Sequence, residues 1–335
     1  MKTAIIGFAG SGKTELFRAL AGSGAAHAGR AMVKVPEPRL DPLAALFSPG
    51  KITKTEIEYL DLPGSGGAGS LGSRVLNDMR GCDCYLAVLD AFSGAVSPED
   101  QLQAIEAELM ISDMAVIEKK LERLAQDKKK AKHLYDRNQE ELLEKAMAVL
   151  EQEIPLRWDA DLCREPDLKG FAFLSARPIL YAWNIAENSI GSFEPPQEQE
   201  GMSHIPVSAM LEREMAELED PDELAMFMQD LGVAESALDR VIARTYTLLD
   251  LITFLTAGEK EVRSWALKKG STAAQAAGTI HTDIQKGFIR AEVLGWDDFL
   301  QYESMKKAKE KGVLRLEGRD YIVRDGDIIT FRFNV

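Results

Sequence analysis

The sequence is poor in cysteine, with only Cys82, Cys84 and Cys163 among 335 residues. Three cysteines at this spacing provide neither a disulfide framework nor a four-ligand metal site. The sequence also leads directly into a strand-like run, so we expect no signal peptide. Together these absences predict a reducing, cytoplasmic setting.

Long apolar runs and an excess of basic residues are also missing. No stretch is apolar for long enough to span a membrane, so we expect no membrane partner. The formal net charge is -14, which excludes attraction of nucleic acid by the molecule as a whole but not by a local basic patch. A hydrophobic content of 45% fits a globular protein with a sizeable core.

The clearest motif that is present stands at residues 7–14, where GFAGSGKT matches the phosphate loop G-x-x-x-x-G-K-[ST] at every fixed position. A strand-like run precedes it and an amphipathic helical pattern follows, which is the context this loop requires. We expect its backbone N–H groups and the helix N-terminus to hold a triphosphate. The predicted nucleotide-binding residues here are Ala9, Gly10, Ser11, Gly12, Lys13, Thr14 and Glu15.

Two side chains of this loop have individual roles in the prediction. Lys13 is expected to reach the β- and γ-phosphates, and the Thr14 hydroxyl to ligate Mg²⁺. The strand-like run 57–61 ends in Asp61, which begins a D-x-x-G sequence closed by Gly64. We expect Asp61 to join the Mg²⁺ shell and the Gly64 N–H to meet the γ-phosphate.

A third motif concerns the base. Guanine-specific proteins use N-K-x-D, whereas this chain has Asn184, Ile185, Ala186 and Glu187 after a buried strand-like run. The longer acid and the missing lysine favour adenine, which presents a hydrogen-bond donor at its 6-position. Ser208, Ala209 and Met210 resemble the loop that closes over the base.

The catalytic apparatus is sparse in the sequence. Ser65 stands after D-x-x-G, where a glutamine often orients the attacking water, and residues 21–33 contain no threonine to complete Mg²⁺ coordination. We therefore expect slow hydrolysis and assign no catalytic residue.

Outside these motifs the chain changes character twice. Residues 98–154 contain no glycine and repeat apolar residues at helical spacing, which predicts a hairpin of two long helices with a lysine-rich tip at 128–133. From residue 251 onward, short strand-like runs at 251–256, 262–267, 289–293, 321–323 and 328–333 alternate with helical segments at 272–277 and 296–310, as in a small α+β domain.

In these motifs the chain resembles the YchF / Obg-like ATPase family of P-loop NTPases. The residues that carry the resemblance are VPEPRLD at 35–41, Asn184 to Glu187, TAGEKEVRSW at 256–265, AAGTIHTD at 276–283, KGFIRAEV at 286–293 and the ending DGDIITFRFNV. The first switch and the second switch are shorter than the family pattern, and residues 91–96 lack the histidine proposed as catalytic in the family.

The resemblance implies an α/β P-loop NTPase fold, an Obg-like G domain with an inserted coiled-coil hairpin and a C-terminal TGS-like β-grasp domain. The expected boundaries are 1–97 and 160–249 for the G domain, 98–159 for the hairpin and 250–335 for the TGS-like domain. It also implies slow hydrolysis of ATP, possibly also of GTP, with Mg²⁺, and association with the ribosome through the hairpin and the TGS-like domain.

Two alternatives stay open at this point. A non-catalytic adaptor would hold ATP or GTP as a structural ligand and act by binding alone. A guanine-specific regulatory GTPase would use the same phosphate loop, although Glu187 disfavours guanine.

Overall fold

The computed structural model describes the chain except residues 23–28, 63–68, 131–132, 134, 219 and 335. Contacts divide it into two units, one of Met1–Val33 with Ile57–Leu248 and one of Lys34–Glu56 with Leu249–Val335. None of the described helices combines the length and apolar character needed to cross a membrane.

The first unit is built on a six-stranded sheet whose strands lie in the order β2-β4-β1-β5-β6-β7. Strand β1 pairs in parallel with β4 and β5, and β5, β6 and β7 continue the parallel pairing. The bounds are β1 Lys2–Ile6, β2 Arg30–Lys34, β4 Glu56–Asp61, β5 Cys84–Ala91, β6 Ile179–Ile185 and β7 Met202–Val207.

Burial explains why these segments form a parallel sheet. Every residue of β6 is buried, as are the first six residues of β5, which is the continuous apolar pattern of strands covered on both faces. The register places Asp90 beside Asn184, so the carboxyl ends of these strands meet at one edge. In open parallel sheets this edge carries the ligand site.

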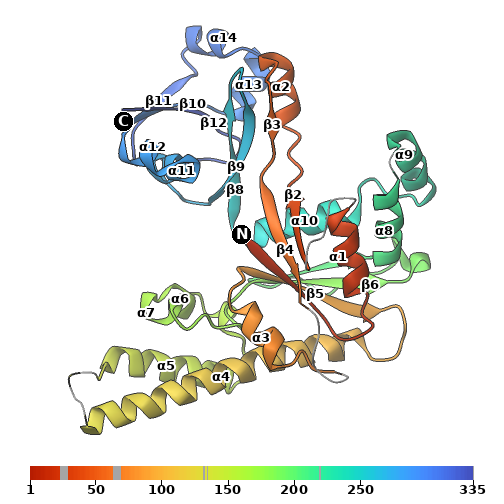
Figure 1. The fold of residues 1–335 in the computed structure, drawn as a ribbon, viewed down its shortest axis with the longest axis vertical. Helices are drawn as coiled ribbons and strands as arrows, with labels where there is room; N and C mark the ends of the chain where they lie inside the picture. The colour runs from red at the N-terminus through yellow and green to blue at the C-terminus, as the bar shows by residue number, and fades with distance from the viewer. Residues whose placement is uncertain (23–28, 63–68, 131–132, 134, 219, 335) are drawn as a thin grey trace. The chain divides into compact units, whose positions relative to one another are not determined.

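Helices cover both faces of this sheet (Figure 1). Their bounds are α1 Lys13–Ala21, α3 Ser73–Met79, α6 Ala160–Arg164, α7 Pro166–Lys169, α8 Ala209–Glu217, α9 Pro221–Asp230 and α10 Ala237–Leu248, with short 3-10 turns η2 Leu156–Trp158 and η3 Glu187–Ser189. Helix α1 lies beside α8, which brings the phosphate loop near the start of α8. The strand-like runs before the phosphate loop, at 57–61 and before Asn184 are therefore confirmed as β1, β4 and β6.

Two long helices leave the sheet, as the periodicity predicts. Helix α4 spans Pro98–Lys130 and α5 spans Arg137–Leu150, and they bury a shared apolar seam that includes Ile117, Leu124 and Leu143. The Asp136 side chain caps α5 by accepting from the Gln139 N–H at 3.0 Å.

The second unit contains another six-stranded sheet, in the order β11-β10-β12-β8-β9-β3. Its strands are β3 Ile52–Thr53, β8 Leu251–Ala257, β9 Val262–Lys268, β10 Phe288–Leu294, β11 Arg315–Glu317 and β12 Ile328–Phe333, and its helices are α2 Leu40–Phe47, α11 Ala273–Ile280, α12 Thr282–Lys286, α13 Trp296–Tyr302 and α14 Met305–Glu310. Successive residues enter different cores: Phe254 packs with α11, and Leu255 packs with α2 and α13. Both faces of this sheet are therefore covered.

One strand of this unit was placed wrongly by the sequence. Residues 321–323 form no strand, whereas β11 at Arg315–Glu317 was not expected. The backbone of 321–323 instead bonds the start of α11: the Ala273 N–H donates to the Tyr321 carbonyl at 2.8 Å, and the Val323 N–H donates to the Ser271 carbonyl at 3.0 Å.

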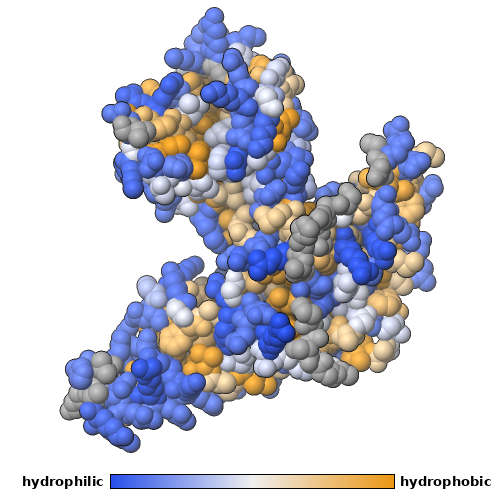
Figure 2. All heavy atoms as spheres, in the orientation of Figure 1, coloured by the Kyte–Doolittle hydropathy of each residue, from blue (hydrophilic) through white to orange (hydrophobic). Residues whose placement is uncertain are grey.

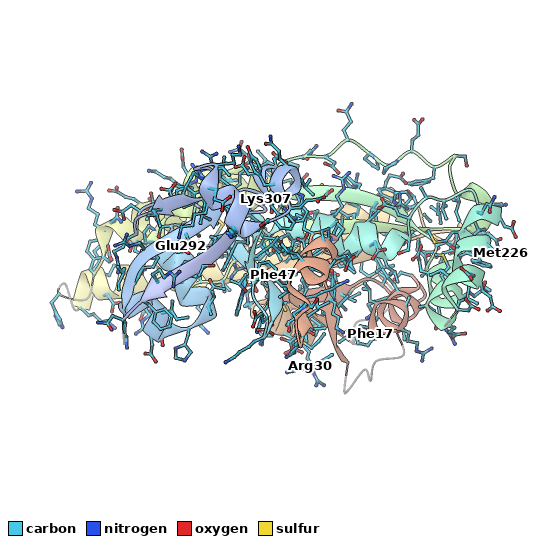
Figure 3. All side chains as sticks on the ribbon, turned by 90° about the horizontal axis from the view of Figure 1, so that it is seen from above. Phe17, Arg30, Phe47, Met226, Glu292 and Lys307 are labelled. Carbon is cyan, nitrogen blue, oxygen red and sulfur yellow. The ribbon has the colours of Figure 1, made fainter. Side chains whose placement is uncertain are left out.

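Residues 34–56 belong to the second unit by their contacts, although the sequence groups them with the nucleotide-binding part. Leu40 and Leu43 of α2 are fully buried there, and Phe47, labelled in Figure 3, packs against the same core. Arg39 holds Glu37 with a two-armed ion pair and reaches Asp325 at 2.6 Å. The contact with Asp325 joins residues far apart in the sequence, so no local pattern predicts it.

Candidate functional site

The loop between β1 and α1 has the backbone geometry of a phosphate cradle. Gly7 and Gly12 have φ angles of +151° and +87°, which side chains rarely allow. A Cβ on Gly12 would lie 2.1 Å from Asn184 Nδ2, and one on Gly7 would lie 2.5 Å from the Val88 carbonyl oxygen. Both glycines are therefore required by close approach as well as by backbone conformation.

Lys13 opens α1 and lies over the end of β4. Its Nζ donates to the Leu62 carbonyl at 2.6 Å and lies 3.7 Å from Asp61 Oδ1. Burial is the largest influence on this ammonium and lowers its pKa, while the neighbouring Asp61 carboxylate acts in the opposite direction. The lysine is thus positioned at the sheet edge with weak hydration, which suits it to pair with phosphate oxygens.

Two oxygens beside this lysine are buried without a hydrogen-bond partner among the described residues, namely Ser11 Oγ and Asp61 Oδ1. Buried polar atoms are normally paired, so a ligand that supplies partners is expected. Within the described part of the chain no group of three or more His, Cys, Asp or Glu side chains could hold a metal by itself. A hard cation would therefore be held by few protein oxygens together with phosphates, as Mg²⁺ usually is.

Asn184 links the phosphate loop to the predicted closing loop at 208–210. It is the next-to-last residue of β6 and has 6% of its surface exposed. Its Nδ2 donates to the Ser11 carbonyl at 2.9 Å, and its Oδ1 accepts from the Ala209 N–H at 3.0 Å. An amide group can donate from its nitrogen and accept at its oxygen at the same time. Ser11, Asn184 and Ala209 are therefore held in one constellation.

Next to this constellation is a pocket of about 680 Å³. The predicted residues that line it are Gly12, Glu15, Asn184, Ile185, Glu187, Ser208, Ala209 and Met210. Its size lies in the range of small-molecule sites, and it begins where the phosphate loop ends. The structure thus brings the predicted base segment, the predicted closing loop and the loop's Gly12 together.

The remaining predicted residues lie elsewhere. Ala9, Gly10, Ser11, Lys13, Thr14 and Asp61 do not line this pocket; Ala9 and Gly10 are exposed in the phosphate loop, and Thr14 is exposed in the first turn of α1. Gly64 and Ser65, and with them the second switch, lie outside the described residues.

Sequence reasoning missed several residues of the pocket: Phe92, Ala186, Leu211, Arg213, Glu214 and Glu217. Phe92 directly follows β5, so its position at the carboxyl edge of the sheet could have been predicted from the sequence. Arg213 was not, because its Nη1 reaches Glu15 Oε2 at 2.6 Å only through the packing of α8 on α1.

The segment after β5 provides no candidate base. Asp90 accepts from the N–H groups of Phe92 and Ser93 and from the Ser93 hydroxyl, and so stabilises its own turn. Catalysis therefore stays unassigned.

Comparison with known proteins places the chain among relatives of one kind. Residues 251–334 match the family model YchF-GTPase_C, described as "Protein of unknown function (DUF933)". The chain is 39% identical to the ribosome-binding ATPase YchF of Haemophilus ducreyi over 363 residues, covering 100% of this chain and 99% of the relative. It is 37% identical to the Bacillus subtilis protein of the same name, covering 99% and 98%.

Solved structures agree. The YchF GTPase of Schizosaccharomyces pombe superposes with a TM-score of 0.88 at 27% identity, over 99% of this chain and 97% of that one. A GTP binding protein from Pyrococcus horikoshii reaches a TM-score of 0.63 at 18% identity over 100% of both chains, which is a likeness of fold alone.

Proposed function

Because this chain belongs to the YchF family, we propose that it binds ATP with Mg²⁺, hydrolyses it slowly and acts as a ribosome-associated nucleotide switch. The relatives are named as ribosome-binding ATPases. The observation that carries the proposal is Asn184, whose two hydrogen bonds hold the phosphate loop against the base pocket.

The base preference rests on the end of β6. Both polar atoms of the Asn184 amide are hydrogen-bonded to backbone groups. The base would therefore be recognised by the pocket walls around Ile185 and Glu187. Glu187 is exposed and can accept from the amino group that adenine carries and guanine lacks at the 6-position. We therefore favour ATP, with GTP as a weaker ligand.

Mg²⁺ fits the residues beside Lys13. Asp61 Oδ1 is buried beside the Lys13 ammonium and has no hydrogen-bond partner among the described atoms, and the Thr14 hydroxyl is exposed at the start of α1. These two side chains would hold the ion, which when bound offsets the charge of the phosphate oxygens. Lys13 and the loop N–H groups would bind the remaining oxygens.

Slow turnover follows from what the site does not supply. Residues 21–33 contain no threonine, Ser65 replaces the usual glutamine, and Asp90 is committed to its turn. We propose binding and orientation without an efficient water-activating group.

We further propose that α4 and α5 form a coiled-coil hairpin and that residues 250–335 form a TGS-like domain. The hairpin and the TGS-like domain would both bind the ribosome, in the cytoplasm. The lysine-rich end of α4, Lys128–Lys130, would contribute contacts to phosphates of ribosomal RNA.

Calorimetric titration of the purified chain with ATP and with GTP, each with Mg²⁺, tests the nucleotide proposal. We expect ATP to bind more tightly and Lys13→Ala to weaken it at least tenfold, about 1.4 kcal/mol, while Lys269→Ala, a change of an exposed lysine in the other unit, leaves it unchanged. GTP binding tenfold tighter than ATP would favour the guanine-specific alternative.

Turnover and ribosome binding separate the remaining alternatives. We expect measurable hydrolysis below about 1 s⁻¹, the lower end of typical enzyme rates, and co-sedimentation with purified ribosomes that depends on nucleotide. Tight ATP binding with no turnover, and ribosome binding indifferent to nucleotide, would identify the non-catalytic adaptor instead.

A further inference from the structure

A second large concavity lies in the first unit, away from the nucleotide pocket. Its volume is about 900 Å³, and it shares no lining residue with the pocket beside Asn184. We name it the α4 groove. The apolar residues that define it are Met110, Ile111, Met114, Leu150, Trp158, Trp183 and Met202.

The α4 groove has an apolar wall that is open to solvent. Ile111 is 63% exposed and Trp158 is 39% exposed, although both are large and hydrophobic. Met110, Ile111 and Met114 occupy neighbouring positions on one side of α4, because residues three and four apart on a helix lie together. Single exposed apolar residues are ordinary, but a group of them lining a concave surface indicates an interaction site.

The floor of the groove holds a neutral aromatic pair, Trp183 and His204. Trp183 is buried there and its Nε1 donates to His204 Nδ1 at 3.2 Å, which requires that nitrogen of the imidazole to be unprotonated. Burial also lowers the pKa of His204, with the Glu198 carboxylate acting against that shift. The Trp183–His204 pair therefore stays neutral at physiological pH.

The rim is acidic. Three exposed glutamates line the groove: Glu99, Glu151 and Glu153. A fourth lining glutamate, Glu106, is buried and forms an ion pair with Arg157. No lysine or arginine is among the described residues that line the groove. An occupant must therefore bring positive charge around apolar side chains.

We propose that the α4 groove docks a basic amphipathic helix of a partner protein. Large apolar side chains of that helix would enter between Ile111, Met114 and Trp158, as in other helix-in-groove complexes. Its lysines or arginines would meet the rim carboxylates Glu151 and Glu153, which steer the encounter and set orientation. A second copy of this chain is a poor occupant, because two molecules of net charge -14 repel.

Figure 2 is consistent with this division of the helix pair. The far end of the hairpin is hydrophilic, and hydrophobic surface begins where α5 nears α6 and α7. The groove residues of α4, Met110, Ile111 and Met114, lie at or before the middle of the helix and not at the hairpin tip.

The experiment uses the full chain and a fluorescent helical peptide of leucine and lysine, followed by anisotropy at roughly physiological salt. A second peptide has the same leucines with glutamate in place of every lysine. We expect the lysine peptide to bind and the glutamate peptide to fail. Equal binding of both would overturn the charge complementarity, and no binding of either would overturn the proposal altogether.

Variants locate the binding. Ile111→Glu and the double change Glu151→Lys with Glu153→Lys are each expected to weaken the lysine peptide at least tenfold. The matched control is Glu118→Lys with Glu122→Lys, two exposed glutamates of α4 that do not line the groove, and it should stay within about twofold, inside the range of surface charge effects.

Equal losses in the groove and control variants would mean non-specific attraction to an acidic protein, and would overturn the proposal. A concentration-dependent dimer in analytical ultracentrifugation, abolished by Ile111→Glu, would assign the groove to a second copy and would also overturn it. ATP affinity of each variant, measured in parallel, shows that the sheet is intact.

Discussion

At the scale of single residues, the site depends on how closely the backbone of the phosphate loop approaches Asn184. No side chain is tolerated on Gly12, because its Cβ would meet Asn184 Nδ2 at 2.1 Å. The same amide bonds the Ser11 carbonyl, so displacing it also disturbs the loop.

Gly12→Ala is therefore expected to weaken ATP binding at least tenfold, about 1.4 kcal/mol, as measured by calorimetric titration. Gly270→Ala is the matched control: Gly270 has φ +80°, close to the +87° of Gly12, but its Cβ would meet nothing within 4 Å. This control should cost stability without changing ATP affinity. Unchanged ATP affinity in Gly12→Ala would mean that the loop binds nucleotide in another conformation.

The three cysteines are expected to react slowly with alkylating reagents. Burial raises the pKa of Cys82 to about 11 and that of Cys84 to about 12, and it also raises the pKa of the half-buried Cys163. Because only the thiolate reacts, these thiols should alkylate far more slowly than free cysteine at about pH 8. We expect Cys163 to label first with iodoacetamide and Cys84 last, with all three labelled in denaturant. Mass spectrometry of peptides reads this order, and fast native labelling of Cys84 would contradict it.

At the scale of elements, α4 is fastened to the sheet by a buried charged pair. Arg157, which lies in η2, donates from Nη1 and Nη2 to Glu106 Oε2 at 2.8 and 3.1 Å, and the Tyr181 hydroxyl of β6 donates to Glu106 Oε1 at 2.6 Å. The pair is nearly inaccessible to solvent. Three elements therefore meet at one carboxylate.

Arg157→Met is expected to cost about 3–5 kcal/mol of unfolding free energy, because it leaves the Glu106 charge buried and unpaired. Urea denaturation measures this. The double variant Glu106→Gln with Arg157→Met should recover part of the loss, since no charge remains. If the single variant were as stable as the wild type, water would have to reach Glu106.

Helices and strands were predicted correctly where the apolar residues follow one clear local periodicity. The apolar residues at helical spacing within 98–154 predicted α4 and α5, and the strand-like run at 57–61 predicted β4. Prediction failed for β11, a three-residue strand at the edge of the sheet that pairs with β10. Such a short strand has no periodicity of its own, and its pairing alone defines it.

At the scale of the whole molecule, the chain passes between its two units three times, after residues 33, 56 and 248. Residues 34–56 follow α1 in the sequence, but their contacts are with the second unit. Strand β3 pairs with β9, and the Thr55 N–H donates to Ser264 Oγ at 2.9 Å.

A chain that ends at Leu248 is therefore expected to lose protection of residues 34–56, because Leu40 and Leu43 lose their apolar partners Leu255 and Ile328. Hydrogen exchange with mass spectrometry compares it with the full chain. Residues 84–91 of β5, buried in the first unit, are the internal control and should remain protected in both. Equal protection of 34–56 in the two chains would show that the segment folds without the second unit.

The sequence by itself determined the chemistry of this protein, because a phosphate loop, an acid at a strand end and the Asn184 segment each require particular residues at fixed local spacing. It also determined the parallel sheet and the helix pair, whose apolar periods are local. Only the tertiary structure decided that Asn184 bonds Ser11 and Ala209, that Arg213 reaches Glu15, that residues 34–56 join the second unit, and that α4 borders an acidic apolar groove. Each of these depends on contacts between residues far apart in the chain, which no local pattern encodes.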